Sequence, residues 1–178
     1  MNRGLFSSPS GAVISADGRY RYLLRRTGFA PSGRIACFIM LNPSTADHER
    51  DDATIRKCIG FARQWMCGEL LVVNLFALRS RHPSNLWADG VEDPVGPENS
   101  DYINLAVERA DAGPDRGVVC CAWGVNGSYM SQDLTVLGWV DWCAPRCLRL
   151  TKAGHPEHPL FVPYAAAIEP RRFNGRRP

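Results

Sequence analysis

The sequence predicts an α/β protein with three layers, α/β/α, in which a central, mainly parallel sheet of four strands is preceded by an N-terminal β-hairpin. Two observations support this fold class. Short apolar runs alternate along the chain with segments of helical periodicity, which is the pattern of β-α-β units. Near the start, two strand-like runs over residues 11–14 and 19–26 flank Asp17-Gly18, a turn signal of hairpins.

Each expected element follows from its periodicity and from the turn residues beside it. The strands are continuous apolar runs, as in strands buried on both faces, and the helices repeat apolar residues every three or four positions. Strands are expected at Ile35–Leu41, Leu70–Phe76, Gly117–Trp123 and Arg146–Leu150, with a short final strand at Leu160–Val162; helices are expected at Asp52–Met66, Asn99–Ala110 and Ser128–Val140, with a turn or single helical turn at His82–Trp87.

Length and composition favour one globular domain. The 178 residues are 45% hydrophobic and 22% charged, which is ordinary for a chain with a substantial core. We expect a single domain over residues 1–168 and a basic, mobile tail over residues 169–178. No apolar run approaches the roughly 20 residues that span a bilayer, and no apolar stretch of a secretory signal follows Met1. A cytoplasmic protein without membrane contact is therefore expected.

The net charge of +3 resides in the tail, so residues 1–168 are formally neutral. A strong electrostatic grip on nucleic acid needs clustered cations, and only the tail supplies a cluster. Any binding to nucleic acid is therefore expected to be local.

Most of the seven cysteines have apolar neighbours in the sequence, which is typical of free thiols buried in a core. Free thiols indicate a reducing compartment. A zinc site is the alternative, formed by Cys143 and Cys147 with His155 and His158. The two histidines are separated by only two residues, fewer than zinc sites usually have. We therefore favour core thiols and expect neither a metal nor another cofactor.

Polar residues follow the expected strands at the sheet edge where α/β proteins bind ligands. Asn42 precedes Pro43, so its side-chain carbonyl either faces a water or ligand or closes a local turn. Asn74 lies within an apolar strand, where an unpaired amide costs about 1–3 kcal/mol. Its partner is either a neighbouring loop or a flat ligand such as a nucleobase edge.

The loop of residues 151–159 offers the other chemical groups. His158 precedes Pro159 and could act as an acid, a base or a hydrogen-bond donor to an oxyanion. The alternative is that it is a surface histidine without a catalytic role. For His155 we favour this second interpretation. Among the acids after the first inner strand, Asp51 or Asp52 is explained as a helix cap. Asp47 lacks that explanation and could orient a water.

Several common motifs are missing, among them the P-loop, G-x-G-x-x-G, H-E-x-x-H and G-x-S-x-G. The segments that are present resemble the bacterial and phage family called domain of unknown function 1643, over about residues 18–163. They are residues 38–47, 51–56, 73–79, 121–124 and 150–152, together with His158-Pro159-Leu160. This resemblance supplies no settled activity.

The order of the same blocks is similar to the uracil-DNA glycosylase superfamily. Asn42-Pro43 matches its water-positioning motif, Asn74 its base-reading asparagine, Trp123-Gly124 a later strand end, and His158-Pro159 its final loop. The resemblance implies a glycosylase-like fold. It departs from the superfamily where Leu160 replaces a small residue and where Asn42 stands without the catalytic aspartate.

This resemblance also implies roles for the residues. Asn42 would orient the attacking water with Asp47 nearby, Asn74 would read the base, and His158 would stabilise the negative charge on the departing base. Leu160 would lie near the hole left by a flipped nucleotide, and Phe76 or Trp123 would stack. The full set expected to contact a base or ligand is Pro43, Ser44, Asn74, Phe76, Trp123, Gly124, Thr151 and Leu160.

The first functional hypothesis is therefore a DNA glycosylase-like hydrolase that acts on an ordinary or modified nucleobase in DNA. The second is a module of the same fold that binds a nucleotide or nucleobase without turnover. A third is an interaction protein whose tail, Arg171 to Arg177, binds nucleic acid. The expected partner is DNA or a nucleotide.

Overall fold

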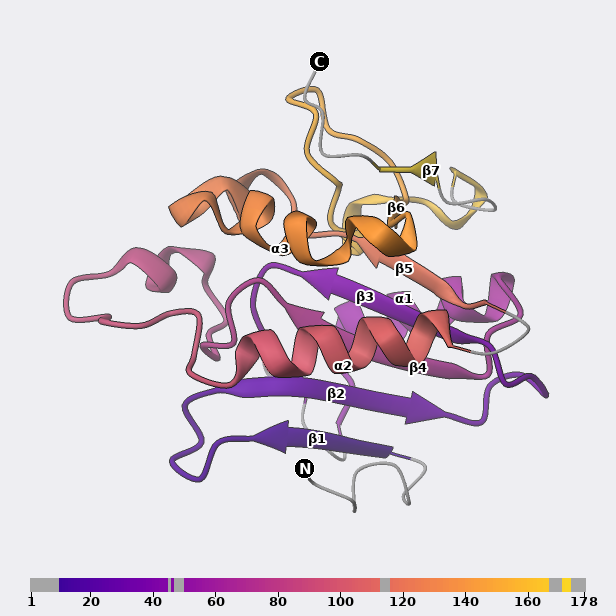
Figure 1. Ribbon diagram of the computed structural model, residues 1–178, viewed down its shortest axis with the longest axis horizontal. Helices are drawn as coiled ribbons and strands as arrows, with labels where there is room; N and C mark the ends of the chain where they lie inside the picture. Colours follow the sequence, from indigo (N-terminus) through magenta and orange to yellow (C-terminus); the bar gives the residue numbers. More distant parts are fainter. Residues whose placement is uncertain (1–9, 45, 47–49, 113–115, 167–170, 174–178) are drawn as a thin grey trace.

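The computed structural model describes residues 10–44, 46, 50–112, 116–166 and 171–173. Within these ranges, seven strands form one mixed sheet in the order β1-β2-β4-β3-β5-β6-β7 (Figure 1). The strands are β1 (Ser10–Ile14), β2 (Arg21–Thr27), β3 (Ile35–Met40), β4 (Glu69–Asn74), β5 (Val118–Cys121), β6 (Arg146–Cys147) and β7 (Arg171–Arg172).

The middle of the sheet is parallel. Strands β4, β3, β5 and β6 run in the same direction, with Met40 in register with Asn74 and Ile39 with Cys121. All six residues of β3 are buried. This explains the unbroken apolar run in the sequence, because a strand covered on both faces has no position at which a polar side chain meets water.

The N-terminal hairpin extends this parallel core on one side. Strands β1 and β2 pair antiparallel, and their connection includes Gly18, whose φ of +72° suits glycine. Strand β2 also pairs antiparallel with β4, so it is covered on both edges. Its buried Arg25 forms an ion pair at 2.8 Å with Glu69 of β4, and Arg26 forms one at 2.8 Å with Asp51.

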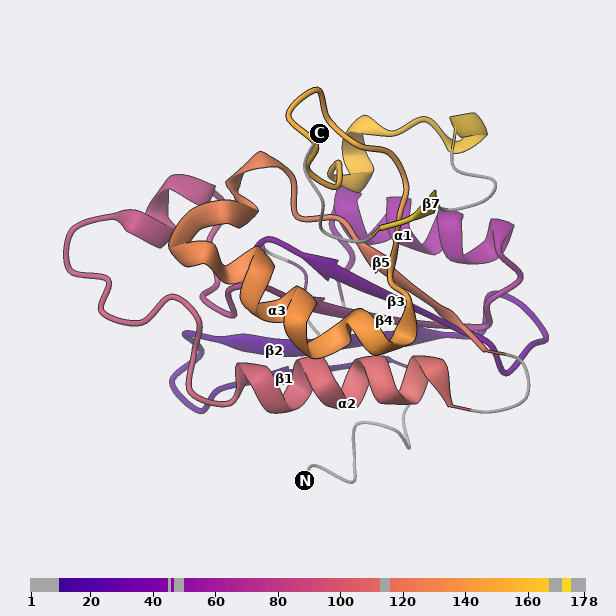
Figure 2. The same cartoon turned by 45° about the horizontal axis from the view of Figure 1, so that its top comes forward.

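Helices cover both faces of the sheet (Figure 2). On one face, α1 (Ala53–Gln64) buries Ile55, Cys58, Phe61 and Ala62 against even-numbered strand residues such as Phe38 and Val72. On the other face, α2 (Asn99–Asp111) and α3 (Gln132–Val140) pack against odd-numbered residues such as Ile39 and Val73. The alternation of strand side chains thus produces two cores, one on each face.

The α/β class and the N-terminal hairpin are confirmed, and several details differ from expectation. The sheet has seven strands among the described residues instead of four with a separate hairpin, because β2 joins the hairpin to β4 and β7 pairs with β6. The expected strand at Arg146–Leu150 is limited to β6. Two residues of the expected tail, Arg171–Arg172, form β7, while residues 174–178 lie outside the described residues.

Two other segments are 3-10 helices. The expected short strand at Leu160–Val162 is instead η4 (Pro159–Phe161), because proline at the first position fixes a helical φ and removes a ladder donor. The helix expected from Ser128 begins later, at Gln132, after η2 (Val125–Ser131), in which Met130 has a φ of +52°. The expected turn at His82–Trp87 is η1 (Pro83–Trp87), and two further 3-10 turns are η3 (Asp141–Cys143) and η5 (Tyr164–Ala166).

A pair of glycine substitutions tests this packing. A Cβ on Gly68 would lie well inside van der Waals distance of the Ser32 carbonyl oxygen, so Gly68→Ala is expected to lower the free energy of unfolding by about 1–3 kcal/mol. Gly138 lies in α3 with open space beside it, so Gly138→Ala is expected to raise this free energy by about 0.5–1 kcal/mol. Urea denaturation of both variants checks the prediction. Equal effects of the two substitutions would contradict the described packing.

Candidate functional site

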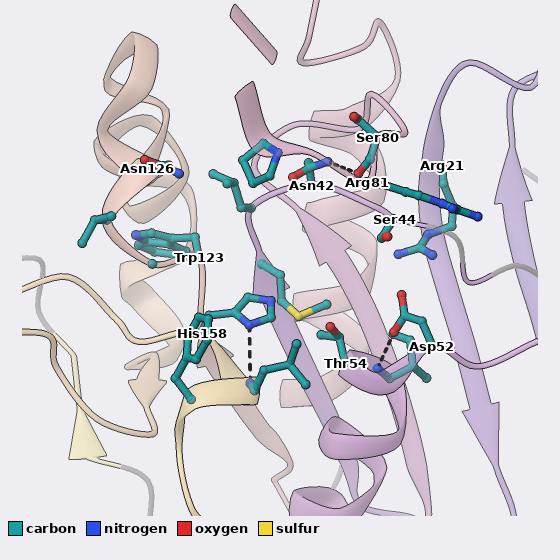
Figure 3. Close-up of a pocket in the computed structure, with 18 residues that line it drawn as sticks. Arg21, Asn42, Ser44, Asp52, Thr54, Ser80, Arg81, Trp123, Asn126 and His158 are labelled. Carbon is teal, nitrogen blue, oxygen red and sulfur yellow. Dashed lines mark hydrogen bonds between the residues drawn. The ribbon is translucent and has the colours of Figure 1, made fainter. Parts of the chain in front are cut away.

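A pocket of about 440 Å³ lies beyond the carboxyl ends of β3 and β5, next to the N-terminus of α1 (Figure 3). This is the sheet edge at which the sequence places its polar residues. The pocket has apolar walls, including Met40, Ile55 and Trp123, and a rim of polar side chains. The polar side chains are Arg21, Asn42, Ser44, Asp52, Thr54, Ser80, Arg81, Asn126 and His158.

Asn42 has a fixed orientation in this pocket. Its Nδ2 donates to the carbonyl oxygens of Ser80 at 2.9 Å and Pro43 at 3.2 Å. Both partners are acceptors, so the amide nitrogen must face them and the Oδ1 atom must face away from them. Figure 3 shows that this oxygen lies on the pocket side of the carboxamide. Asn42 therefore presents an acceptor to whatever occupies the pocket.

His158 presents the opposite polarity. Its Nδ1 accepts a hydrogen bond from the Leu160 backbone N–H at 3.4 Å, which leaves the proton of a neutral imidazole on Nε2. Burial lowers the pKa of His158, and the nearby negative charge of Asp52 opposes this effect. The neutral form is therefore favoured near pH 7. Figure 3 shows the imidazole directed into the pocket, so His158 offers it an N–H donor.

The loop that carries His158 is tied to the end of β5. The N–H of Gly124 donates to the carbonyl oxygen of Pro156 at 2.7 Å. Gly124 has a φ of +74°, a conformation that glycine adopts at little cost. Trp123, directly before it, is buried and forms an edge contact with Phe173. These contacts thus fix the loop that carries His158 relative to the pocket wall at Trp123.

Asp52 has a structural task and also lines the pocket. It is the N-cap of α1, and its Oδ1 accepts from the Ile55 N–H at 2.9 Å. This confirms the expected cap. The second carboxylate oxygen takes no part in that bond, and Figure 3 shows it pointing to the side of the pocket where Ser44 and Arg21 lie. Among the described lining residues, Asp52 is the only carboxylate.

The structure brings several predicted site residues together and leaves others apart. Asn42, Ser44, Trp123, Gly124, His158 and Leu160 all line the pocket. Pro43 contributes through its carbonyl oxygen, which accepts from Asn42 Nδ2 and from the Ser80 N–H. Phe76 and Thr151 do not line it: Phe76 packs against Tyr129, and the Thr151 hydroxyl oxygen accepts from the His155 N–H. Asp47 lies outside the described residues.

Asn74 is the residue on which the base-reading hypothesis depends most. It is the last residue of β4 and is 1% exposed, and neither atom of its carboxamide has a hydrogen-bond partner among the residues that the structure describes. It is not part of the pocket lining, although Met40, its partner in register, is. A direct contact between Asn74 and a ligand therefore stays a prediction.

Sequence reasoning missed six polar lining residues: it explained Asp52 as a helix cap only, and it did not single out Thr54 of α1 or the four that follow. Ser80 and Arg81 follow β4, Arg21 begins β2, and Asn126 lies in η2. The segment after β4 carried a usable signal, since it leaves a parallel strand at the same edge as Asn42. Arg21 carried none, because its position at the pocket depends on the pairing of β2 with β4.

Metal binding has no support in the described geometry. Among the described residues, no group of three or more His, Cys, Asp or Glu side chains is placed to hold a metal ion. The seven cysteines are free thiols, and burial raises the pKa of those in the core, such as Cys37 and Cys58. Of the described helices, none is long and apolar enough to cross a bilayer.

The comparison with known families agrees with the first resemblance noted in the sequence. The family model described as a protein of unknown function, DUF1643, matches residues 21–160. The chain belongs to the DUF1643 family. No curated protein and no solved structure matches the chain significantly. The similarity to uracil-DNA glycosylases therefore rests on the order of the short motifs alone.

The neutral state of His158 gives a testable pH dependence. Because the pKa of His158 in the folded protein lies below its ordinary value of about 6.5, the unfolded chain takes up a proton first as the pH falls. The free energy of unfolding is therefore expected to decrease as the pH drops from 6.5 toward the folded pKa. His158→Asn, whose Oδ1 can replace Nδ1 as acceptor, should remove this part of the pH dependence.

Denaturant titrations between pH 8 and pH 4.5 measure the difference between wild type and variant. His82→Asn is the matched control, because His82 is exposed and lies outside the pocket lining. A His158→Asn curve parallel to that of the wild type would show that His158 is not held neutral by burial.

Proposed function

We propose that this protein hydrolyses the N-glycosidic bond of a nucleotide unit whose base is bound in the pocket, with DNA as the favoured substrate. The observation that carries the proposal is the fixed, opposite polarity of two groups on one pocket. Asn42 presents an oxygen because its amide nitrogen is held by two carbonyl groups, and His158 presents an N–H because its other nitrogen accepts from Leu160.

His158 suits the departing base. Cleavage of the bond between sugar and base leaves an anionic base and an electron-poor sugar. A neutral imidazole that already points its Nε2–H into the pocket can donate to an oxygen or nitrogen of the base as negative charge develops there. Burial of this group strengthens the interaction, because water competes less for the hydrogen bond.

Asn42 and Asp52 suit the attacking water. The Oδ1 of Asn42 can accept one hydrogen of a water and so orient it toward the sugar carbon. A neutral amide cannot remove the proton. The free oxygen of Asp52 can, so the water oxygen forms a bond to the sugar, its proton passes to Asp52, and the bond to the base breaks with its electron pair on the base.

The apolar side chains at the mouth of the pocket support the proposal that a single nucleotide enters it. Leu160 and Phe161 of η4 are 44% and 69% exposed at its rim, close to His158. Proteins that take one base out of a stack often insert apolar side chains beside it. Apolar walls at Trp123 and Met40 give the base a surface on which to lie.

A binding module without turnover is the second candidate, and one observation favours it. Asp52 is the single carboxylate in the described lining, and it already caps α1. If that cap is its whole task, the described lining offers no carboxylate that could take the proton of a water, and the pocket would hold a nucleobase or nucleotide without cleaving it.

Substitution of His158 tests the hydrolase. Purified protein is incubated with single- and double-stranded oligonucleotides that carry uracil, hypoxanthine, 5-hydroxymethyluracil or N6-methyladenine, and abasic sites are revealed by alkaline cleavage. We expect one of these bases to be released and His158→Ala to slow the reaction about 10²- to 10³-fold, as loss of an oxyanion donor does. His82→Ala, an exposed histidine outside the lining, should keep the full rate. Absence of abasic sites in every substrate would favour the binding module.

Asp52→Asn separates the cap from the chemistry. Asparagine caps helices about as well as aspartate, so the Ile55 N–H keeps its acceptor and the thermal midpoint should change little. The carboxylate is lost, so the rate of base release should fall by about 10²- to 10⁴-fold. A variant that is both stable and fully active would show that Asp52 is only a cap.

A further inference from the structure

The pocket continues into a groove lined by arginines. This groove has a volume of about 590 Å³ and shares four lining residues with the pocket: Ser44, Asp52, Ser80 and Arg81. Its remaining lining residues are Arg50, Asp51 and Arg79. The pocket and the groove therefore adjoin, and a ligand bound in one lies beside the arginines of the other.

Two of these arginines have no acidic partner among the described residues. Arg81 is exposed and forms no ion pair there, and Arg79 donates from Nη1 to the Gly18 carbonyl oxygen at 3.0 Å, while its buried Nε has no acceptor. Elsewhere in the protein, arginines such as Arg25 and Arg149 face carboxylates. Within the part of the chain that the structure describes, no ion pair neutralises Arg79 or Arg81.

The aspartates of the groove do not neutralise these arginines in full. Asp51 forms its ion pair with Arg26 at 2.8 Å, and Asp52, which caps α1, contributes one carboxylate charge against Arg79 and Arg81. Arg21 brings a further guanidinium group to the same side, where Figure 3 shows it beside Ser44 and near Arg81. Its Nη1 donates to the Ala46 carbonyl oxygen at 2.7 Å. Guanidinium groups that gather in this way create a positive potential in the groove.

The backbone of residues 79–81 is held in place. The Arg79 N–H donates to the Arg19 carbonyl oxygen at 3.0 Å, and the Ser80 N–H donates to the Pro43 carbonyl oxygen at 2.8 Å. The Ser80 carbonyl oxygen in turn holds Asn42. One rigid segment therefore orients the acceptor of the pocket and carries the arginines of the groove.

We propose that the groove around Arg79 and Arg81 binds the phosphate group of the ligand whose base occupies the pocket. Arginine is suited to this task because its planar N–H pairs match two phosphate oxygens. The inference rests on the proposed function for the identity of the base, and it adds where the phosphate of such a nucleotide or nucleic-acid strand is held and that a free nucleoside would bind poorly. The shared chemistry is a phosphate ester attached to the sugar.

Probes without a base test the groove apart from any hydrolysis. NMR titrations of the wild type compare 2-deoxyribose 5-phosphate with 2-deoxyribose, and an oligonucleotide with a central tetrahydrofuran abasic analogue supplies the phosphodiester. We expect both phosphate-bearing probes to bind and the unphosphorylated sugar not to bind. Stronger binding of the monoester identifies a free nucleotide as the natural source. Stronger, salt-dependent binding of the oligonucleotide identifies a strand.

Two variants and a control locate the binding. Arg79→Gln combined with Arg81→Gln should weaken binding of the phosphate probes at least about tenfold, and Arg81→Gln alone should weaken it less. Because Arg81 is exposed, the single variant is expected to fold normally. Arg63→Gln, an exposed arginine on α1 outside both linings, should bind as the wild type does. Equal affinity of the wild type and the double variant would overturn the proposal.

The outcomes also separate this inference from the hydrolase. If the double variant no longer binds the phosphate probes and the wild type releases no base, the phosphate site is supported and the proposed hydrolase activity is rejected. If the wild type and the double variant release a base at the same rate, and neither binds the phosphate probes, the hydrolase activity is supported and the phosphate site is rejected.

Discussion

The hydrogen-bond ladders on both sides of β3 are the constraint on which the candidate site depends. They continue past the last residue of the strand: the N–H groups of Leu75 and Phe76 donate to Met40 and Leu41, and the N–H of Ala122 donates to Ile39. The three chain segments that leave the sheet here are therefore fixed relative to one another. Asn42, Ser80 and Trp123 owe their common location to these bonds, because each follows one of the three segments within a few residues.

The same region contains polar groups in the interior, and most of them serve the backbone. Asn99 of α2 donates from Nδ2 to the carbonyl oxygens of Asn74 and Leu75, and Gln132 of α3 also donates to Leu75. These bonds satisfy carbonyls where β4 leaves the ladder, which a buried chain requires. The Asn74 carboxamide differs, since it has no hydrogen-bond partner among the described residues. A buried amide without a hydrogen-bond partner lowers the free energy of unfolding by about 1–3 kcal/mol. The packing around Asn74 gives no reason for keeping an amide at this position.

Features encoded by neighbouring residues could be predicted from the sequence. The apolar run of β3, the cap at Asp52 and the position of Asn42 after its strand all follow from local chemistry, and the structure contains each of them. Features that depend on distant pairing could not be predicted in the same way. Arg21 lies at the pocket only because β2 adds to β4, and β7 exists only because a late segment returns to β6. The sequence pattern also could not separate hydrolysis from binding, because these two functions differ in what Asp52 does and not in where it lies.

The lining of the pocket extends along the chain from Arg21 in β2 to Phe161 in η4. This separation makes the site a non-local assembly, in which the last contributions come from the loop tied by Gly124 to Pro156. A chain emerging from the ribosome can form the hairpin and α1 early, but it cannot complete the pocket until residue 161 has been synthesised and has folded back. The pocket is thus completed late in synthesis, after strands β1 to β6 have already left the ribosome.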